Sequence, residues 1–200
     1  MKKILAIVVC LLFCDLIEAQ EKRVIKENFE NNTFQWDEYY EKNYSCGIRD
    51  GYLLLENKDE NFIVWTSVEF PIDAEGNFEI TFNLCPEKID DETWFGILFN
   101  YEDEGNYSKF IVQEKNSRLI NRRNNEESII KKIPIILKKG KEKQVKIKLI
   151  KKSKKLNFLV DDMDVLTISK GVEYNTFGCI VEGKNSLKVT EVTVEETIEQ

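Results

Sequence analysis

The chain has 200 residues, with 36 acidic and 29 basic side chains, no histidine and a formal net charge of −7. An acidic protein repels phosphate backbones, so nucleic acid is excluded as an expected partner. The absence of histidine from the sequence also excludes catalytic devices of the Ser-His-Asp and Cys-His kinds. The length suits a single domain.

The beginning of the chain has the three parts of a signal peptide. Lys2 and Lys3 form a charged start, residues 4–13 form an apolar run too short to span a bilayer, and Ala19 offers a small residue for cleavage. We therefore predict export to the periplasm, cell surface or extracellular space, with residues 1–19 removed. Residues 20–200 would then form one domain that does not span a membrane. A lipid on Cys14 and an uncleaved anchor are the alternatives.

Alternation of apolar and polar residues dominates the rest of the chain. It predicts strands, in chain order, at 23–29, 43–48, 51–56, 62–70, 77–84, 94–101, 106–113, 117–122, 127–133, 144–149, 156–160, 164–169, 175–182 and 186–195. Turn residues such as Asp50-Gly51 and Gly183-Lys184-Asn185 separate these runs. So many short strands with one apolar face each predict an all-β, two-sheet antiparallel β-sandwich with almost no helix. The residues expected in its core are Phe78, Ile80, Phe82, Phe95, Ile97, Phe99, Phe110, Val145, Ile147, Phe158 and Val160.

Three cysteines, Cys46, Cys85 and Cys179, lie beyond the predicted signal peptide. Three cannot all pair within one chain, and without histidine their spacing fits no zinc site. They are interpreted either as small buried side chains or as one disulfide with one additional thiol. We expect no metal and no cofactor.

The stretch WFGILFNYEDEGNYSKFIV, Trp94–Val112, is typical of a hairpin around an acidic turn. If residues 102–105 form a four-residue loop, Tyr101 lies opposite Asn106, and the two faces of the hairpin follow. One face belongs in the core and carries Phe95, Ile97, Phe99, Phe110 and Val112, with Ser108 as a polar neighbour. The other combines large aromatic with polar side chains: Trp94, Gly96, Leu98, Asn100, Tyr107, Lys109, Ile111 and Gln113.

The second face of the hairpin suits a sugar, because aromatic rings stack on apolar CH faces while amide and amine groups bind hydroxyls. Gly96 has no side chain, so a ligand could approach the backbone there. The alternative is that another segment covers this face. The residues predicted to contact carbohydrate are Trp94, Asn100, Tyr107 and Lys109, with Trp65 and Arg122 as weaker candidates.

Three charged segments have simpler interpretations. The acidic runs 102–104 and 161–164 are expected to be solvated turns, because hard cations need six or more oxygen ligands. Residues 131–155 hold twelve lysines and one acid, Glu142. They could form a basic patch for an anionic partner, but lysines alternating with apolar residues favour the solvated face of a strand.

Several segments, in order, resemble the concanavalin A-like, laminin-G-like jelly-roll domains of bacterial secreted proteins. The resemblance implies a jelly roll over residues 22–197 that serves as a binding or accessory module, often for glycans. The family's usual Asn-Gly turn is replaced here by Asp161-Asp162-Met163. The matching segments are residues 27–32 (ENFENN) with Trp36, 51–54 (GYLL), 77–80 (NFEI), 94–99 (WFGILF), 106–107 (NY) with Phe110 and Val112, 156–160 (LNFLV) and 177–181 (FGCIV).

Jelly rolls of this type also include retaining glycoside hydrolases, whose carboxylates alternate along a strand about 5 Å apart. The nearest match is the run KIDDE, residues 88–92, which has lysine at the nucleophile position and is typical of a loop. We therefore predict an exported, non-catalytic module that binds a glycan on its concave sheet. The alternative is a protein-interaction or envelope structural domain without a sugar site.

Overall fold

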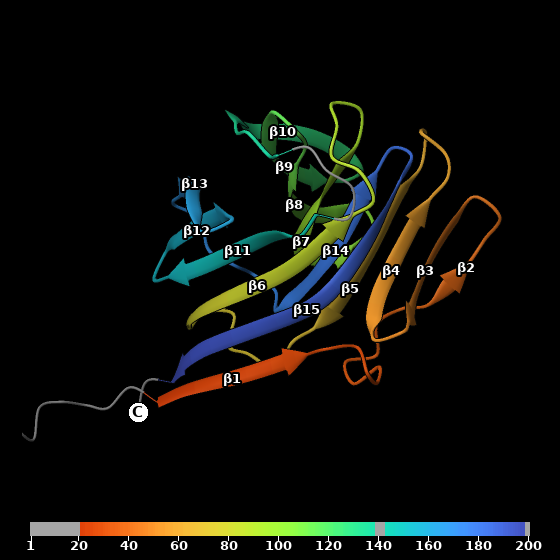
Figure 1. Ribbon diagram of the computed structural model, residues 1–200. Helices are drawn as coiled ribbons and strands as arrows, with labels where there is room; N and C mark the ends of the chain where they lie inside the picture. Colours follow the sequence, from red (N-terminus) through yellow and green to blue (C-terminus); the bar gives the residue numbers. More distant parts are fainter. Residues whose placement is uncertain (1–20, 139–142, 199–200) are drawn as a thin grey trace, which may run out of the picture.

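The computed structural model describes residues 21–138 and 143–198. Over these residues the chain forms two antiparallel sheets packed face to face, with no helix (Figure 1). This confirms the predicted all-β, two-sheet sandwich. Among these residues, then, no helix is present that could cross a membrane. The predicted signal peptide and its cleavage site at Ala19 lie outside the described residues.

Sheet A is the larger sheet and has nine strands among the described residues. Its order is β13 (Met163–Ile168), β12 (Lys155–Val160), β11 (Val145–Lys152), β6 (Asn77–Pro86), β15 (Asn185–Ile198), β4 (Tyr52–Asn57), β3 (Tyr44–Arg49) and β2 (Tyr39–Tyr40), with β1 (Glu21–Glu27) also paired to β15. The long strand β15 pairs with β6 along one side and with β4 and then β1 along the other. It therefore runs through the middle of the sheet (Figure 1).

Sheet B lies behind sheet A in Figure 1. Its order is β10 (Glu126–Pro134), β9 (Asn116–Arg123), β8 (Asn106–Val112), β7 (Trp94–Asp103), β14 (Thr176–Glu182) and β5 (Ile63–Glu69). Consecutive hairpins join the four strands β7, β8, β9 and β10, whereas β14 and β5 come from distant parts of the chain.

The core lies between the two sheets and follows the period of two. In β6 and β11 every second side chain is buried, because successive side chains of a strand point to opposite faces. All eleven residues predicted for the core belong to the buried cluster between the sheets.

The hairpin tip between β7 and β8 differs from the prediction. The register over residues 95–99 is the predicted one, but Asp103 rather than Tyr101 pairs with Asn106. Asp103 Oδ1 accepts a hydrogen bond from the Gly105 amide at 2.7 Å and fixes a tight turn. The additional residues of β7 form a bulge, in which Asn100 has a positive φ of 52°.

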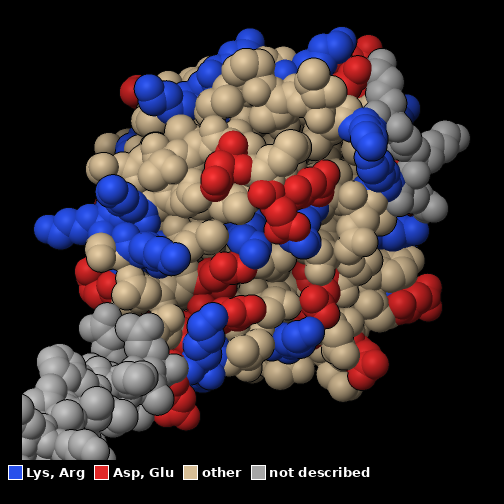
Figure 2. All heavy atoms as spheres, turned by 60° about the vertical axis from the view of Figure 1, so that its left-hand side comes forward, with Lys and Arg blue, Asp and Glu red and all other residues tan. Residues whose placement is uncertain are grey.

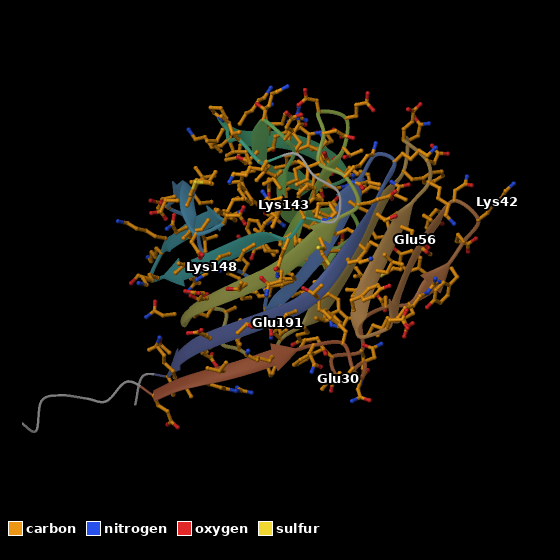
Figure 3. All side chains as sticks on the ribbon, viewed as in Figure 1. Glu30, Lys42, Glu56, Lys143, Lys148 and Glu191 are labelled. Atoms are coloured by element: carbon orange, nitrogen blue, oxygen red, sulfur yellow. The ribbon has the colours of Figure 1, made fainter. Side chains whose placement is uncertain are left out.

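Lys146 and Lys148, which alternate with the apolar residues of β11, lie on its solvated face, as predicted, and have acidic partners, whereas Lys151 is buried and donates to the carbonyls of Glu75 and Gly76. Lys146 contacts Asp162 at 2.9 Å, and Lys148 contacts Glu79 of β6. Figure 3 shows Lys148 and Glu191 on the outer side of sheet A. On the side of the molecule where β11–β13 lie, basic and acidic side chains are interspersed (Figure 2). The lysine-rich segment therefore does not make this side uniformly basic.

Two of the three cysteines are buried thiols in the core, which agrees with the first interpretation. Cys46 of β3 and Cys179 of β14 have no solvent exposure, whereas Cys85 is half-buried. Burial raises the pKa of the Cys46 thiol to about 12 and raises the pKa of Cys179 well above its ordinary value.

These two thiols make the stability of the fold sensitive to alkali. Their pKa values are higher in the folded than in the unfolded chain, so the unfolded chain loses the protons first. The stability that they contribute is complete below pH 9.0, the ordinary pKa of cysteine, and is lost as the pH rises towards 12. We expect the free energy of unfolding in urea to fall above pH 9.0 and the fall to be smaller in Cys46→Ala.

Cys85→Ala is the control, because its half-buried thiol lies outside the core cluster. Part of the fall should persist in Cys46→Ala, because Cys179 and Tyr39 also have raised pKa values caused by burial. Equal slopes for wild type and Cys46→Ala would contradict the assignment.

Candidate functional site

The outer side of sheet B carries the second side-chain set of each strand, which we call the Trp94/Tyr107 face. Because one set of each strand fills the core, alternation sends the other set outward. The cross-strand pairs place these residues on one surface. The face consists of Trp65, Trp94, Leu98, Tyr101, Tyr107, Lys109, Ile111, Arg118, Ile120, Arg122, Glu127, Ile129, Lys132, Ile180 and Glu182.

The face has an aliphatic layer beneath larger side chains. Leu98, Ile111 and Ile180 have no solvent exposure although they point away from the main core. Together with Tyr107 and Ile120 they form a second apolar cluster, against which Trp65, Trp94 and Tyr101 pack while remaining partly exposed. The partial exposure of the two tryptophans shows that no other described segment covers this face completely.

Three aromatic rings cross the face in a row. The ring centroids of Trp65 and Tyr101 are 4.9 Å apart, and those of Tyr101 and Tyr107 are 6.3 Å apart with nearly parallel planes. The row joins β5, β7 and β8 and gives the face a continuous aromatic strip.

Lys109 is the most buried charged side chain of the face, with 1% exposure. Its Nζ lies 2.7 Å from Glu127 Oε1 and 2.5 Å from Glu182 Oε1. Burial alone would lower the pKa of Lys109, but the two carboxylates outweigh that effect and raise it above its ordinary value. Arg122 lies 3.6 Å from the same oxygen of Glu127. The charge of Lys109 is therefore balanced within the face.

Arg118 is held differently, on a ring rather than on a carboxylate. Its guanidinium carbon lies 4.1 Å from the centroid of the Trp94 ring, a cation–π distance. Its Nε is buried and has no hydrogen-bond partner among the described residues. None of the ion pairs of the described residues includes Arg118.

The structure brings together five of the six residues predicted to contact carbohydrate: Trp65, Trp94, Tyr107, Lys109 and Arg122. Asn100 lies apart. It is fully buried, its Oδ1 accepts a hydrogen bond from the Glu173 amide at 2.7 Å, and its Nδ2 donates to the Gly171 carbonyl. The bulge shifts the alternation by one residue, so Tyr101 takes the outward place that Asn100 was predicted to occupy.

Sequence reasoning missed eight further members of the face: Tyr101, Arg118, Ile120, Glu127, Ile129, Lys132, Ile180 and Glu182. Arg118 could have been predicted from the sequence. It lies four residues before Arg122 on a strand whose limits were predicted nearly correctly, so both side chains point to the same side of the sheet. Glu127 and Glu182 could not have been predicted, because they are 18 and 73 residues from Lys109 along the chain and only the fold brings them close to it.

The acidic runs 102–104 and 161–164 are exposed, as predicted, but only Glu104, Asp161 and Asp162 lie in turns, because β7 extends to Asp103 and β13 begins at Met163. The run KIDDE, residues 88–92, forms a loop, as predicted. In the loop between β6 and β7, Asp90 Oδ1 accepts hydrogen bonds from the amide and hydroxyl of Thr93, each at 2.9 Å, and Asp91 contacts Lys115 at 2.7 Å. Burial would raise the pKa of Asp90, but hydrogen bonds from Lys88 and Thr93 outweigh it and lower the pKa. Over residues 21–138 and 143–198 no group of three or more acidic or cysteine side chains could hold a metal ion.

Comparisons with known proteins give a fold but no family. No family model and no curated protein matches the sequence. Several solved structures match at low identity. The carbohydrate-binding module CBM66 from Bacillus subtilis has a TM-score of 0.56 and 14% identity, over 78% of this chain and 94% of that chain. The Emp47p carbohydrate recognition domain has a TM-score of 0.62 and 11% identity, over 88% and 95%. A β-glucanase from Bacillus licheniformis has a TM-score of 0.59 and 9% identity, over 88% and 98%.

At such identities the likeness concerns the fold alone. Its jelly-roll type agrees with the concanavalin A-like resemblance seen in the sequence. No family match supports the narrower group of bacterial secreted laminin-G-like domains.

Lys109→Met tests the ion cluster of the face. The variant leaves Glu127 and Glu182 without their shared cation, and removing one partner of a buried pair is strongly destabilising. We expect a loss of about 3 kcal/mol in the free energy of unfolding, at the lower end of the usual range because Glu127 keeps a third of its surface in water. Urea titration measures the loss. Lys115→Met is the matched control, since the Lys115–Asp91 pair is exposed, and a loss of similar size there would contradict the explanation.

Gly96→Ala tests whether this glycine serves the sheet or a ligand. A Cβ at Gly96 would lie 2.1 Å from the carbonyl oxygen of Phe110 on the neighbouring strand. We therefore expect a loss of about 3 kcal/mol in unfolding free energy, typical of severe overpacking. Gly171→Ala is the control, because a Cβ there meets nothing within 4 Å. If Gly96→Ala were as stable as wild type, β7 and β8 would have to move apart at this point at little cost in free energy, which would contradict the explanation.

Proposed function

We propose that this protein is a non-catalytic glycan-binding domain that uses the Trp94/Tyr107 face. The observation that carries the proposal is the composition of that face: partly exposed tryptophans and arginines lie over a buried aliphatic layer. Sugars present both apolar CH surfaces and hydroxyl edges, and such a face offers partners for both. The similarity in fold to a carbohydrate-binding module and a carbohydrate recognition domain supports the proposal.

The polar groups of the face are fixed before a ligand arrives. Glu127 and Glu182 are held by Lys109 but keep 33% and 19% of their side-chain surface exposed. A carboxylate has more acceptor sites than these bonds use, so both can also accept hydroxyl hydrogens. Preorganised groups lose little entropy when they bind, which suits a shallow site.

The carboxylates of the face support binding rather than hydrolysis. A glycosidase of the retaining type needs one carboxyl group that keeps its proton in apolar surroundings and a second that is ionised. Glu127 and Glu182 instead both contact the ammonium of Lys109, and Glu127 also lies 3.6 Å from Arg122, so neither carboxylate has apolar surroundings. The likeness to a glucanase therefore concerns the sandwich and not a matching pair of catalytic groups.

A glycan partner is consistent with export, which stays a prediction from residues 1–19. A protein-interaction domain is the second candidate, and one observation favours it. The edge strand β10 exposes Ile129 and Ile130 by 56% and 48%. Apolar residues on an open edge can pair with another chain, although Lys131 and Lys132 beside them oppose such pairing. A protein partner at that edge would be lost in Ile130→Lys.

The test of the proposed function is a glycan array followed by calorimetry. We expect dissociation constants of about 10 µM to 1 mM, which correspond to about 4–7 kcal/mol. Trp94→Ala and Trp65→Ala should each weaken binding at least ~10-fold, because each removes a large ring from the face.

Tyr40→Ala is the matched control, since Tyr40 is 55% exposed on sheet A, away from the face. Thermal unfolding of each variant checks that the sandwich is intact. The proposal fails if no glycan binds, or if both tryptophan variants bind as tightly as wild type.

A further inference from the structure

We propose that the glycan is acidic and that Arg118 and Lys132 bind its carboxylate. The inference rests on the proposed function and names the ligand class of the same face. The two residues are directly opposite each other in the pairing of β9 with β10, so their side chains share the outer side of sheet B.

Arg118 is held in a position that suits anion recognition. The Trp94 ring supports one face of the guanidinium at 4.1 Å. The buried Nε lacks a partner, whereas the two terminal nitrogens neither bond to the described residues nor belong to its buried unpaired atoms. Those terminal nitrogens therefore reach solvent. A guanidinium stacked on a ring keeps its donors free for a planar carboxylate.

Lys132 adds a second charge at the same place. It is exposed at the edge of the sheet and forms no ion pair with the described residues. Like charges directly opposite each other across two strands repel. A bound anion would reduce that repulsion, so the two cations favour a negatively charged ligand over a neutral one.

The other cations of the face are already neutralised. Lys109 has two carboxylate partners, and Arg122 lies 3.6 Å from Glu127. The excess positive charge of the face is thus confined to Arg118 and Lys132. An anion that arrives at that end finds two cations without a carboxylate partner among the described residues.

The arrangement favours an acidic oligosaccharide over a simple anion or an acidic peptide. Arg118 and Arg122 are four residues apart on β9, which is about 13 Å along a strand. A ligand that spans this length puts its charge at Arg118 and its hydroxyls near Glu127, whose carboxylate accepts hydroxyls but repels further anions. One sugar ring is too short for this, so the ligand has at least two units.

The experiment compares acidic oligosaccharides with their methyl esters, which keep the sugar rings and remove the charge. A glycan array containing oligouronates, sialylated glycans and the methyl ester of each selects the best pair for calorimetry. We expect the acid to bind at least ~10-fold tighter than its ester, a difference of about 1.4 kcal/mol. Arg118→Gln should abolish that preference, because it should weaken binding of the acid more than binding of the ester, and Lys132→Gln should reduce the preference.

The matched control is Arg49→Gln. Arg49 also stacks on a ring, Tyr40 at 5.2 Å, but on sheet A. It should leave the preference intact. Arg118→Lys, which keeps the charge, should retain more of the preference than Arg118→Gln, and thermal unfolding shows whether each variant is folded.

Several outcomes would overturn the inference. Equal affinity for acid and ester, or an unchanged preference in Arg118→Gln, leaves the proposed glycan site standing and rejects the acidic ligand. A polyglutamate probe that binds as tightly as the best acidic glycan rejects it as well, since charge alone would then suffice. Failure of every neutral and acidic glycan to bind rejects both the inference and the proposed function.

Discussion

Burial of the inner side of sheet B is the constraint on which the candidate site depends. Alternate residues of β7, β8 and β9 point into the core and most of them are apolar, and the pleat then sends the intervening residues outward. Some of these outward residues, such as Leu98 and Ile111, are themselves apolar and would be costly to leave in water. Long neighbours cover them, so the outer side of sheet B becomes a second, thinner layer rather than a bare sheet. Aromatic and basic side chains reach the surface because they are long enough to form that cover.

The buried ammonium of Lys109 organises the charges within this layer. An unpaired charge in such surroundings is strongly unfavourable, so carboxylates must come to it. They come from β10 on one side and β14 on the other, so one nitrogen atom connects three strands, β8, β10 and β14, across the intervening β9 and β7. The same contacts use up the negative charge of the layer. Arg118, which rests on Trp94, is thereby left without a carboxylate partner among the described residues.

The features that depend on local alternation of apolar and polar residues could be predicted from the sequence. The strands, the core residues and the register of residues 95–99 follow from the period of two, which a buried face imposes strongly. The two-residue strand β2 is too short to show any period. The bulge at Asn100 was not predictable from alternation, because it is stabilised by bonds to Gly171 and Glu173, more than seventy residues later. The partners of Lys109 were hidden for the same reason, since they are brought near only by the sheet order.

The net charge of −7 and the Arg118–Lys132 pair act over different distances. At physiological salt the Debye length is about 8 Å, so carboxylates on distant surfaces act weakly on a bound ligand, whereas adjacent groups act strongly. A polyanion with charge along its whole length would meet Glu127 and Glu182 as well as Arg118, and the repulsion would oppose its binding. A glycan with a carboxylate on one sugar avoids those contacts and keeps the favourable one. In the proposed site, the carboxylates that balance Lys109 would therefore also discriminate among anions, because specificity arises from repulsion of the wrong ligand as much as from attraction of the right one.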